Sequence, residues 1–330
     1  MYVDQEGRYA VKVLVGPNGK GLEEAIPELS QMYPDIEFVH CARREDTSEM
    51  IVDASIYLGG LNRETFLAAK RLKWIQTTST GVNRYLAIPE LVESDVLLSS
   101  VRGTHGACLA ESVFAMILAF TRQIRNCVTK QQQRDWSNRE CRPRMIELTG
   151  STMGIIGFGA VGRAVAKRAA AFDMRVVAVD LFPTNTPPSV SELWGLDHLD
   201  ELLGQSDYVV VAVPYTPDTE GMIGAKEIGK MKPTAMLVGI SRGKIIDEDA
   251  LVAALRGGGL KAAALDVFAQ EPLPADSDLW DIENLLITPH AAGGTQFERQ
   301  YILDIFCENL DRFVRGELPL LNQIDKERGF

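Results

Sequence analysis

The sequence predicts an α/β protein built on two doubly wound parallel sheets. Short β-branched runs alternate with amphipathic stretches along most of the 330 residues. The runs of the second half are apolar throughout, which is typical of parallel strands covered by helices on both faces. The length also exceeds that of one typical hydrophobic core. Together these observations indicate two α/β domains with a cleft between them.

The first series of strands is expected within the first hundred residues. Five short runs rich in Val, Ile and Leu fit strands, at 11–16, 36–40, 54–60, 74–78 and 96–100. We expect them to form the smaller, flavodoxin-like sheet.

The second series begins after residue 150. Six apolar runs fit strands, at 153–159, 175–180, 208–214, 235–241, 262–267 and 285–290. Helical patterns lie between them, for example at 160–172 and 247–256. This alternation predicts the larger sheet.

Two more helical patterns define the expected domain boundaries. Residues 108–130 read as one long helix, followed by a polar, Arg-rich segment at 131–144. Apolar side chains recur at intervals of three and four from Phe297 to Phe313, which predicts an amphipathic helix that returns the chain to its first domain. The predicted domains are therefore 1–101 together with 293–330, and 102–292.

Charge and cysteine content restrict the expected partners. With 34 Lys and Arg against 45 Asp and Glu, the net charge is −11 at pH 7. Such a chain repels phosphate backbones and anionic membranes, although local donors can still bind a small anion. The five cysteines form no CxxC pair, and the amino terminus does not resemble a signal peptide. We therefore expect a cytoplasmic protein without nucleic-acid or membrane partners.

A glycine-rich turn follows the apolar run that begins at residue 153. Gly157, Gly159 and Gly162 form the pattern G-x-G-x-x-G, and a helical pattern starts at Ala160 and Val161. The first glycine permits a tight turn, the second lets the backbone approach a pyrophosphate, and the third lets the helix pack on the strand. The amino terminus of the helix then faces the anion. The pattern predicts a Rossmann dinucleotide site.

Asp180 ends the following strand and bears on the choice of cofactor. A carboxylate at this place accepts a hydrogen bond from a ribose 2′-hydroxyl and repels a 2′-phosphate. The next residues, Leu181, Phe182 and Pro183, supply no adjacent cation. The sequence therefore favours NAD over NADP.

Three polar residues follow predicted strands of the second series. Arg242 comes after 235–241, Glu271 lies shortly after 262–267, and His290 ends the run at 285–290. Ligands of doubly wound sheets bind beyond the carboxyl ends of the strands, so these side chains are candidates for chemistry.

The three residue types suit hydride transfer at a 2-hydroxy or 2-oxo acid. A guanidinium binds a carboxylate bidentately and polarises a neighbouring carbonyl. A histidine donates and recovers the alcohol proton, and a glutamate behind it holds the ring in one tautomer. The scheme needs no metal, and the sequence shows no cluster with zinc-ligand spacing.

At this point the chain resembles the D-isomer-specific 2-hydroxyacid dehydrogenase family over nearly its whole length. The resemblance rests on the glycine motif with Asp180, on the segments PYTPDTEGMIG and MKPTAMLVGISRGKIIDEDAL, and on ALDVFAQEPLP and TPHAAG. It places the catalytic arginine, glutamate and histidine at Arg242, Glu271 and His290. It also implies glyoxylate or hydroxypyruvate as the substrate.

The resemblance implies further contacts. Asp266 would contact the nicotinamide carboxamide, and the loop 78–82 would bind the substrate carboxylate. The implied cofactor residues also include Val213, Pro214, Ile240, Ser241 and Gly293, and the implied substrate residues are Gly59, Ser79, Thr80 and Gly81. One departure is Gly239, where the family usually has an asparagine, a change that could loosen the strand end.

The sequence is also compatible with two other functions, and it favours one oligomeric state. An NAD(H)-sensing interaction protein of the corepressor type shares the fold, and a phosphite dehydrogenase could use the same arginine and histidine. The first half of the 108–130 helix is too apolar for one buried stripe, which favours a homodimer joined through the nucleotide-binding domains. Trp136 is then a candidate to border the partner's substrate pocket.

Overall fold

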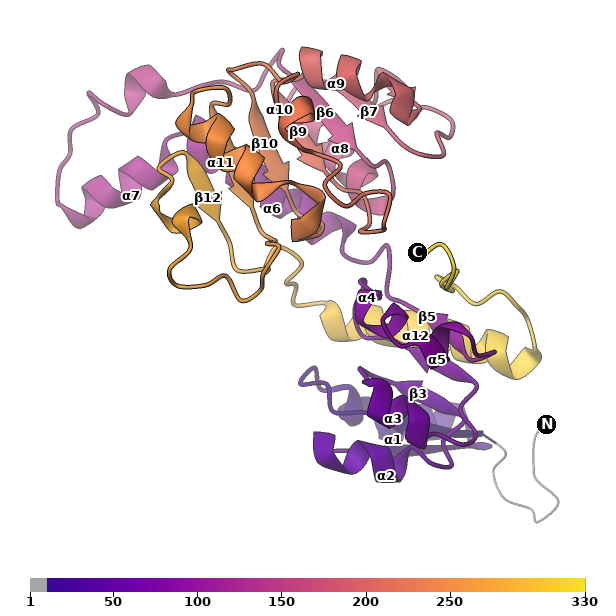
Figure 1. Cartoon of the computed structure of the whole chain (residues 1–330). Coiled ribbons are helices and arrows are strands. Elements are labelled where there is room, and N and C mark those ends of the chain that lie inside the picture. Colours follow the sequence, from indigo (N-terminus) through magenta and orange to yellow (C-terminus); the bar gives the residue numbers. More distant parts are fainter. Residues whose placement is uncertain (1–10, 330) are drawn as a thin grey trace. The chain divides into compact units, whose positions relative to one another are not determined.

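A computed structural model describes residues 11–329 (Figure 1). The described chain forms two compact units, the first of residues 11–104 and 295–329 and the second of residues 105–294. Each unit contains one parallel sheet, which confirms the predicted fold class. Most of the amino-terminal segment that we expect not to be a signal peptide lies outside the described residues.

The first unit has five parallel strands in the order β2-β1-β3-β4-β5, which is the flavodoxin-like order. The strands are β1 (Val11–Val15), β2 (Ile36–His40), β3 (Ile56–Leu58), β4 (Trp74–Gln76) and β5 (Leu97–Ser99). The helices are α1 (Ile26–Met32), α2 (Thr47–Met50), α3 (Arg63–Ala68), α4 (Asn83–Leu86), α5 (Pro89–Val92) and α12 (Glu298–Arg315). All five predicted strands are present, and α12 confirms the amphipathic helix expected near the end of the chain.

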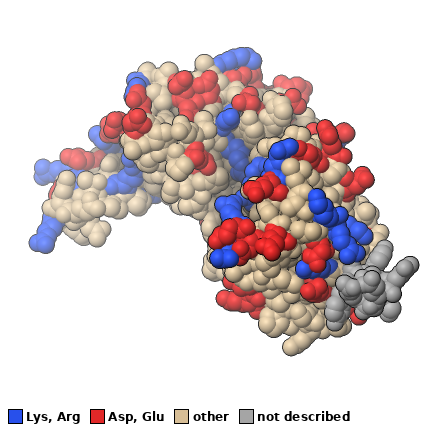
Figure 2. Space-filling model, turned by 60° about the horizontal axis from the view of Figure 1, so that its bottom comes forward, with Lys and Arg blue, Asp and Glu red and all other residues tan. Residues whose placement is uncertain are grey.

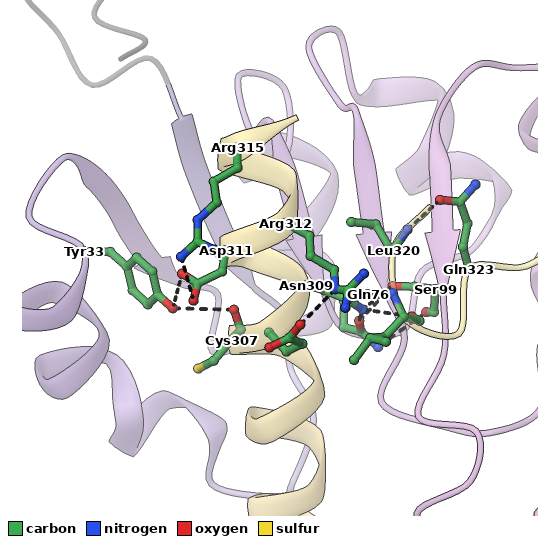
Figure 3. A network of polar contacts seen from close by, with 12 residues as sticks. Tyr33, Gln76, Ser99, Cys307, Asn309, Asp311, Arg312, Arg315, Leu320 and Gln323 are labelled. Carbon is green, nitrogen blue, oxygen red and sulfur yellow. Dashed lines mark hydrogen bonds and ion pairs between the residues drawn. The ribbon is translucent and has the colours of Figure 1, made fainter. Parts of the chain in front are cut away.

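A buried polar network fastens α12 to this sheet. Asn309 of α12 donates from Nδ2 to Gln76 Oε1 (3.1 Å), and Ser99 Oγ donates to the same oxygen (2.7 Å). Figure 3 shows these three side chains converging between α12 and the sheet. The backbone N–H of Leu321 donates to Asn309 Oδ1 (2.6 Å), so the network also holds the segment after the helix. Because all three polar side chains are fully buried, their mutual hydrogen bonds are what makes burial tolerable.

The second unit has seven parallel strands in the order β12-β11-β10-β9-β6-β7-β8, the Rossmann arrangement. The strands are β6 (Thr152–Ile156), β7 (Arg175–Val179), β8 (Glu192–Trp194), β9 (Tyr208–Val211), β10 (Met236–Gly239), β11 (Ala262–Leu265) and β12 (Leu285–Ile287). Six match the predicted runs. Strand β8 was not predicted, because it is a half-buried edge strand of three residues without an apolar run.

Helices cover both faces of the second sheet. Side chains of α6 (Gly106–Thr121) and α8 (Ala160–Ala171) join one core cluster. Side chains of α9 (Leu199–Gln205), α10 (Ala225–Ile228) and α11 (Glu248–Arg256) join the other. This double cover explains why the strands are apolar throughout.

The single helix predicted for 108–130 is wrong. The chain forms α6 and then α7 (Ile124–Gln132), and the two axes are bent by 66°. Gln123 at the break adopts a left-handed conformation (φ 56°), and its side-chain amide donates to the carbonyl of Phe120 (2.8 Å). A glutamine gives no such signal in a sequence, because Gly or Asn is the residue expected at a left-handed position.

Helix α7 and the segment after it project from the sheet of their own unit (Figure 1). No residue of α7 is buried, and Ile124 and Val128 are 49% and 47% exposed. We call residues 123–147 the arm. Within residues 11–329 no single helix has the length and apolarity needed to cross a membrane, and α6 with α7 meet that description only as a bent pair.

Candidate active site

The glycine loop between β6 and α8 has the shape that a dinucleotide requires. Gly157 has a φ of 95°, and a Cβ there would lie 2.8 Å from the backbone of Ala212. A Cβ on Gly162 would lie 2.2 Å from the carbonyl oxygen of Gly157, so only glycine allows α8 to pack this closely. A Cβ on Gly159 would meet no atom within 4 Å. The open space at Gly159, beside the first turn of α8 at Ala160 and Val161, fits a pyrophosphate.

Asp180 lies directly beside this loop. Its Oδ2 accepts a hydrogen bond from the backbone N–H of Phe158 (2.6 Å), and its Oδ1 accepts one from Phe182 (2.9 Å). Val213 and Pro214 follow the neighbouring strand β9, so they emerge at the same edge of the sheet. The strand order reverses between β6 and β9, which is where ligands of such sheets bind.

Arg163 is a cation that the sequence did not place near Asp180. Its guanidinium donates to Thr184 Oγ1 (2.7 Å) on the loop after Asp180 and lies 4.7 Å from the ring centroid of Phe158. The sequence does not indicate this contact, because Arg163 lies in the first turn of α8 and not next to Asp180 along the chain.

Arg242, Glu271 and His290 follow three neighbouring strands that end in register. Gly239 of β10 pairs with Leu265 of β11, and Leu265 pairs with Ile287 of β12. Each of these residues is the last of its strand. The three candidate side chains therefore emerge side by side at one edge of the sheet.

His290 and Glu271 form a hydrogen-bonded pair. The Nδ1–H of His290 donates to Glu271 Oε2 at 2.7 Å, and Glu271 Oε1 accepts from the backbone N–H of Phe268 at 2.9 Å. Because a carboxylate only accepts, Nδ1 carries the proton and Nε2 is left to face a reactant. Both side chains are partly open to solvent.

Glu271 lies close enough to Arg242 for its charge to affect the pKa of the guanidinium. Burial lowers the pKa of the Arg242 guanidinium, and the charge of Glu271 acts against that change. The same side chain donates from Nη1 to the carbonyl of Ser241 (2.6 Å), which orients it beyond the end of β10 next to Ile240 and Ser241.

Gly239 does not loosen the end of β10. It pairs with strands on both sides, at Val211 and Leu265. A Cβ there would lie 2.8 Å from side-chain atoms of Ile246 and Leu265, so those side chains already fill the space.

Asp266 is a buried carboxylate that holds the histidine loop. It is 1% exposed, and its oxygens accept hydrogen bonds from Thr288 Oγ1 (2.6 Å) and from the backbone N–H groups of Ala291 (2.9 Å) and Ala292 (3.0 Å). Its carbonyl accepts from the N–H of His290 (2.8 Å). His290 has a left-handed backbone (φ 52°), which is unfavourable for a residue with a side chain unless its surroundings impose it. The contacts of Asp266 supply that constraint.

The residues implied for substrate binding lie in the first unit, after β3 and β4. Ser79 Oγ donates to the carbonyl of Gly81 (3.0 Å), and Thr77 Oγ1 donates to the carbonyl of Ser79 (2.6 Å), so side chains shape the loop that includes Thr80. Gly59 follows β3. A cavity of about 410 Å³ opens at these strand ends; its lining consists of Pro17, Asn18, Gly19, Arg44, Gly60, Thr78 and Arg84. Neither arginine belongs to a recognised motif, so the sequence gives no signal that selects them.

Known proteins share both the sequence pattern and the fold. The family described as D-isomer specific 2-hydroxyacid dehydrogenase, NAD binding domain, matches residues 114–292. A glycerate dehydrogenase from Methylorubrum extorquens is 39% identical over 264 residues, covering 78% of this chain and 81% of the relative. A glyoxylate reductase from Korarchaeum cryptofilum is 33% identical over 276 residues, covering 82% of each chain. The chain belongs to the D-isomer-specific 2-hydroxyacid dehydrogenase family.

Membership of this family confirms the expected enzyme class, a D-2-hydroxyacid dehydrogenase with a nicotinamide cofactor. The structure of a glyoxylate/hydroxypyruvate reductase from Sinorhizobium meliloti, in complex with NADP and sulfate, superimposes with a TM-score of 0.83 at 26% identity and covers 97% of this chain and 100% of that one. The chain spans only 56% of the length of a D-3-phosphoglycerate dehydrogenase from Methanocaldococcus jannaschii, to which it is 32% identical.

Replacing Asp266 by Asn tests whether its carboxylate positions His290. An amide cannot accept on both sides, so the loop 288–292 loses hydrogen bonds to a charged group and the imidazole moves. A displacement near 1 Å costs about 100-fold in rate, so we expect kcat of Asp266→Asn to fall by about that factor while the Kd for NADH changes less than twofold. Stopped-flow fluorescence and steady-state assays measure the two quantities.

The matched control is Asp207→Asn. Asp207 also accepts a backbone N–H, from Thr152 (2.9 Å), but it lies at the opposite ends of the strands. This variant should lose stability and keep its kcat. A weakened NADH affinity with unchanged kcat in Asp266→Asn would instead support the nicotinamide contact that the family resemblance implies.

Proposed function

We propose that this dehydrogenase reduces a small 2-oxo acid with NADH, or oxidises the matching 2-hydroxy acid. The observation that carries the proposal is the His290–Glu271 pair at 2.7 Å, at the same sheet edge as Arg242 and the glycine loop. The nicotinamide cofactor supplies the hydride when bound. The protein must then bind the acid, orient its carbonyl and move one proton.

Each member of the trio has a distinct role in this proposal. Arg242 binds the carboxylate and polarises the carbonyl oxygen. His290 donates a proton from Nε2 to the developing alkoxide, and Glu271 keeps the other ring nitrogen protonated. In the reverse direction His290 takes the alcohol proton.

We assign substrate binding to the first unit and cofactor binding to the second. Backbone N–H groups of the loop at Ser79, Thr80 and Gly81, together with Gly59, would hold the substrate carboxylate. Gly293 follows the His290 loop and would border the cofactor. Glyoxylate and hydroxypyruvate are the first substrates to assay, because relatives bear the names glyoxylate reductase and glycerate dehydrogenase.

Small molecules are the partners that this surface favours. Acidic side chains accompany the basic ones over the face shown in Figure 2, and the net charge of −11 repels a phosphate backbone. The described cysteines, at 41, 108, 127, 141 and 307, form no disulfide, and we propose a reducing, cytoplasmic location.

Substitution of His290 tests the proton transfer. General acid–base catalysis contributes 10²–10⁴-fold, so His290→Gln should lower kcat by about that range and leave the Kd for NADH within twofold. The control is His198→Gln, because His198 also pairs with an acid, Glu201 (3.0 Å), but follows β8, the strand farthest from β12 in the sheet order. Turnover of His290→Gln equal to that of the unmodified protein would remove His290 from the mechanism.

Substitution of Asp180 tests the preference for NADH. Loss of the carboxylate removes a charge-assisted hydrogen bond to the ribose and a repulsion toward a 2′-phosphate. Asp180→Ala should therefore raise the KM for NADH by about 10-fold and reduce the discrimination against NADPH. A preference of the unmodified protein for NADPH would contradict our assignment, and Arg163→Ala would then show whether that guanidinium holds the 2′-phosphate.

The arm favours a homodimer joined through the second unit. Besides Ile124 and Val128, it exposes Met145 (37%) and Trp136, whose side chain is fully exposed. Sedimentation at micromolar concentration should give about twice 36.3 kDa, because a second copy would bury these side chains. The double variant Ile124→Asp/Val128→Asp should sediment as a monomer. A monomeric unmodified protein would reject the dimer.

A further inference from the structure

The cavity of the first unit lies where its strand order reverses. All five strands of this sheet end on one register row: His40, Val15, Leu58, Gln76 and Ser99. The lining residues follow this row after four different strands, and all but Arg84, which lies in α4, come within four residues of a strand end. Because β1 lies between β2 and β3, the segments on its two sides diverge and leave a space at the carboxyl ends.

Two arginines line this cavity and give it a positive charge. Arg44 follows β2 and Arg84 belongs to α4, and no acidic residue is among the lining residues. Within residues 11–329 neither guanidinium forms an ion pair. Neighbouring arginines behave differently, since Arg43 pairs with Asp46 (2.8 Å) and Arg63 pairs with Glu90. No described acidic side chain therefore neutralises either of the two cavity arginines, and both remain available to an anionic ligand.

Arg84 is also held in place before any ligand binds. Its Nη2 donates to the hydroxyl of Tyr85 (2.8 Å), and its guanidinium lies 4.7 Å from the centroid of that ring. The group covers Gly60 so closely that a Cβ there would lie 2.5 Å from Nη2. One hydrogen bond to Tyr85 leaves most of the guanidinium donors available to a ligand.

Both cations act on the same buried group. Burial raises the pKa of the Tyr57 hydroxyl, and the charges of Arg44 and Arg84 lower it. Tyr57 donates to the carbonyl of Gly60 (3.1 Å), so this hydroxyl lies beside the cavity lining. The two guanidinium groups thus contribute positive potential to one place.

The size of the cavity adds to this argument. The cavity is open to solvent, and its volume of about 410 Å³ is within the range of small-molecule sites. Glyoxylate has only the one carboxylate that we assign to Arg242 and the loop at 79–81, so it has no second anionic group for the arginines.

We infer that the substrate is a 2-oxo acid with a second anionic group, a carboxylate or a phosphate, which Arg44 and Arg84 bind in this cavity. The inference rests on the proposed function, because it names the substrate class of that site. Guanidinium groups recognise both kinds of oxyanion bidentately, so the two are compared as separate arms of the test.

The experiment compares matched substrates by kcat/KM in the full-length protein. In each pair, the charged member is the compound that carries a second anionic group. The carboxylate arm pairs 2-oxoglutarate with 2-oxohexanoate, a monoanion of similar length. The phosphate arm pairs 3-phosphohydroxypyruvate with hydroxypyruvate. We expect at least a 10-fold preference for the charged member of one pair, and we expect Arg44→Gln and Arg84→Gln each to reduce that preference about 10-fold. Arg63→Gln, a surface arginine outside the cavity, should retain it.

Calorimetric binding of the same four compounds separates failure of the inference from failure of the proposed function. No preference in either pair, or a preference that survives both cavity substitutions, overturns the inference even if hydroxypyruvate is reduced. If none of the compounds is reduced with NADH or NADPH, the proposed function fails. The inference about the cavity is then decided by whether the charged member binds at least 10-fold more tightly and loses this advantage in Arg44→Gln and Arg84→Gln.

Discussion

The alignment of strand ends is the constraint on which the rest of the molecule depends. In the second unit all seven parallel strands end on one register row: Trp194, Val179, Ile156, Val211, Gly239, Leu265 and Ile287. Parallel pairing brings every following segment out at the same edge. The glycine loop, Asp180, Arg242, Glu271 and His290 are therefore neighbours although more than 130 residues separate the first from the last.

The buried carboxylate of Asp266 fixes the position of His290 beyond the strand ends. Strand β12 ends three residues before His290, and a free loop of that length would let the imidazole take many positions. Asp266 removes this freedom by accepting from Thr288, Ala291 and Ala292. Helix α6 adds support, since Ser112 Oγ donates to the carbonyl of Ala292 (3.0 Å). The strained backbone of His290 is then stabilised by groups that do not themselves take part in proton transfer.

The first unit uses the same architecture for a different purpose. In our proposals its strand ends supply backbone N–H groups and two arginines for the substrate, whereas those of the second unit supply a histidine, an acid and a glycine loop. The buried network of Gln76, Ser99 and Asn309 lies at this edge too, because Gln76 and Ser99 are the last residues of β4 and β5. It ties α12 to β5 and to β4, whose following loop carries Thr78 and Ser79, so distant parts of the sequence form one unit.

The sequence by itself determined what depends on local pattern. Apolar runs located eleven of the twelve strands, and the spacing of Gly157, Gly159 and Gly162 located the turn whose geometry the structure shows. The positions of Arg242, Glu271 and His290 after predicted strands were also sufficient to select them as candidates. Hydrophobic periodicity and glycine spacing can be recognised in a sequence because each involves residues close together along the chain.

Only the tertiary structure decided what depends on contacts between distant segments. No local signature predicts the break at Gln123, the hydrogen bond from Arg163 to Thr184, or the presence of Arg44 and Arg84 in the lining of one cavity. The side chains of Ile246 and Leu265 fill the space beside Gly239, and Asp266 turns out to be enclosed by its own loop. Each of these depends on side-chain packing in three dimensions, where one favourable contact outweighs the weak preference that a residue type carries alone.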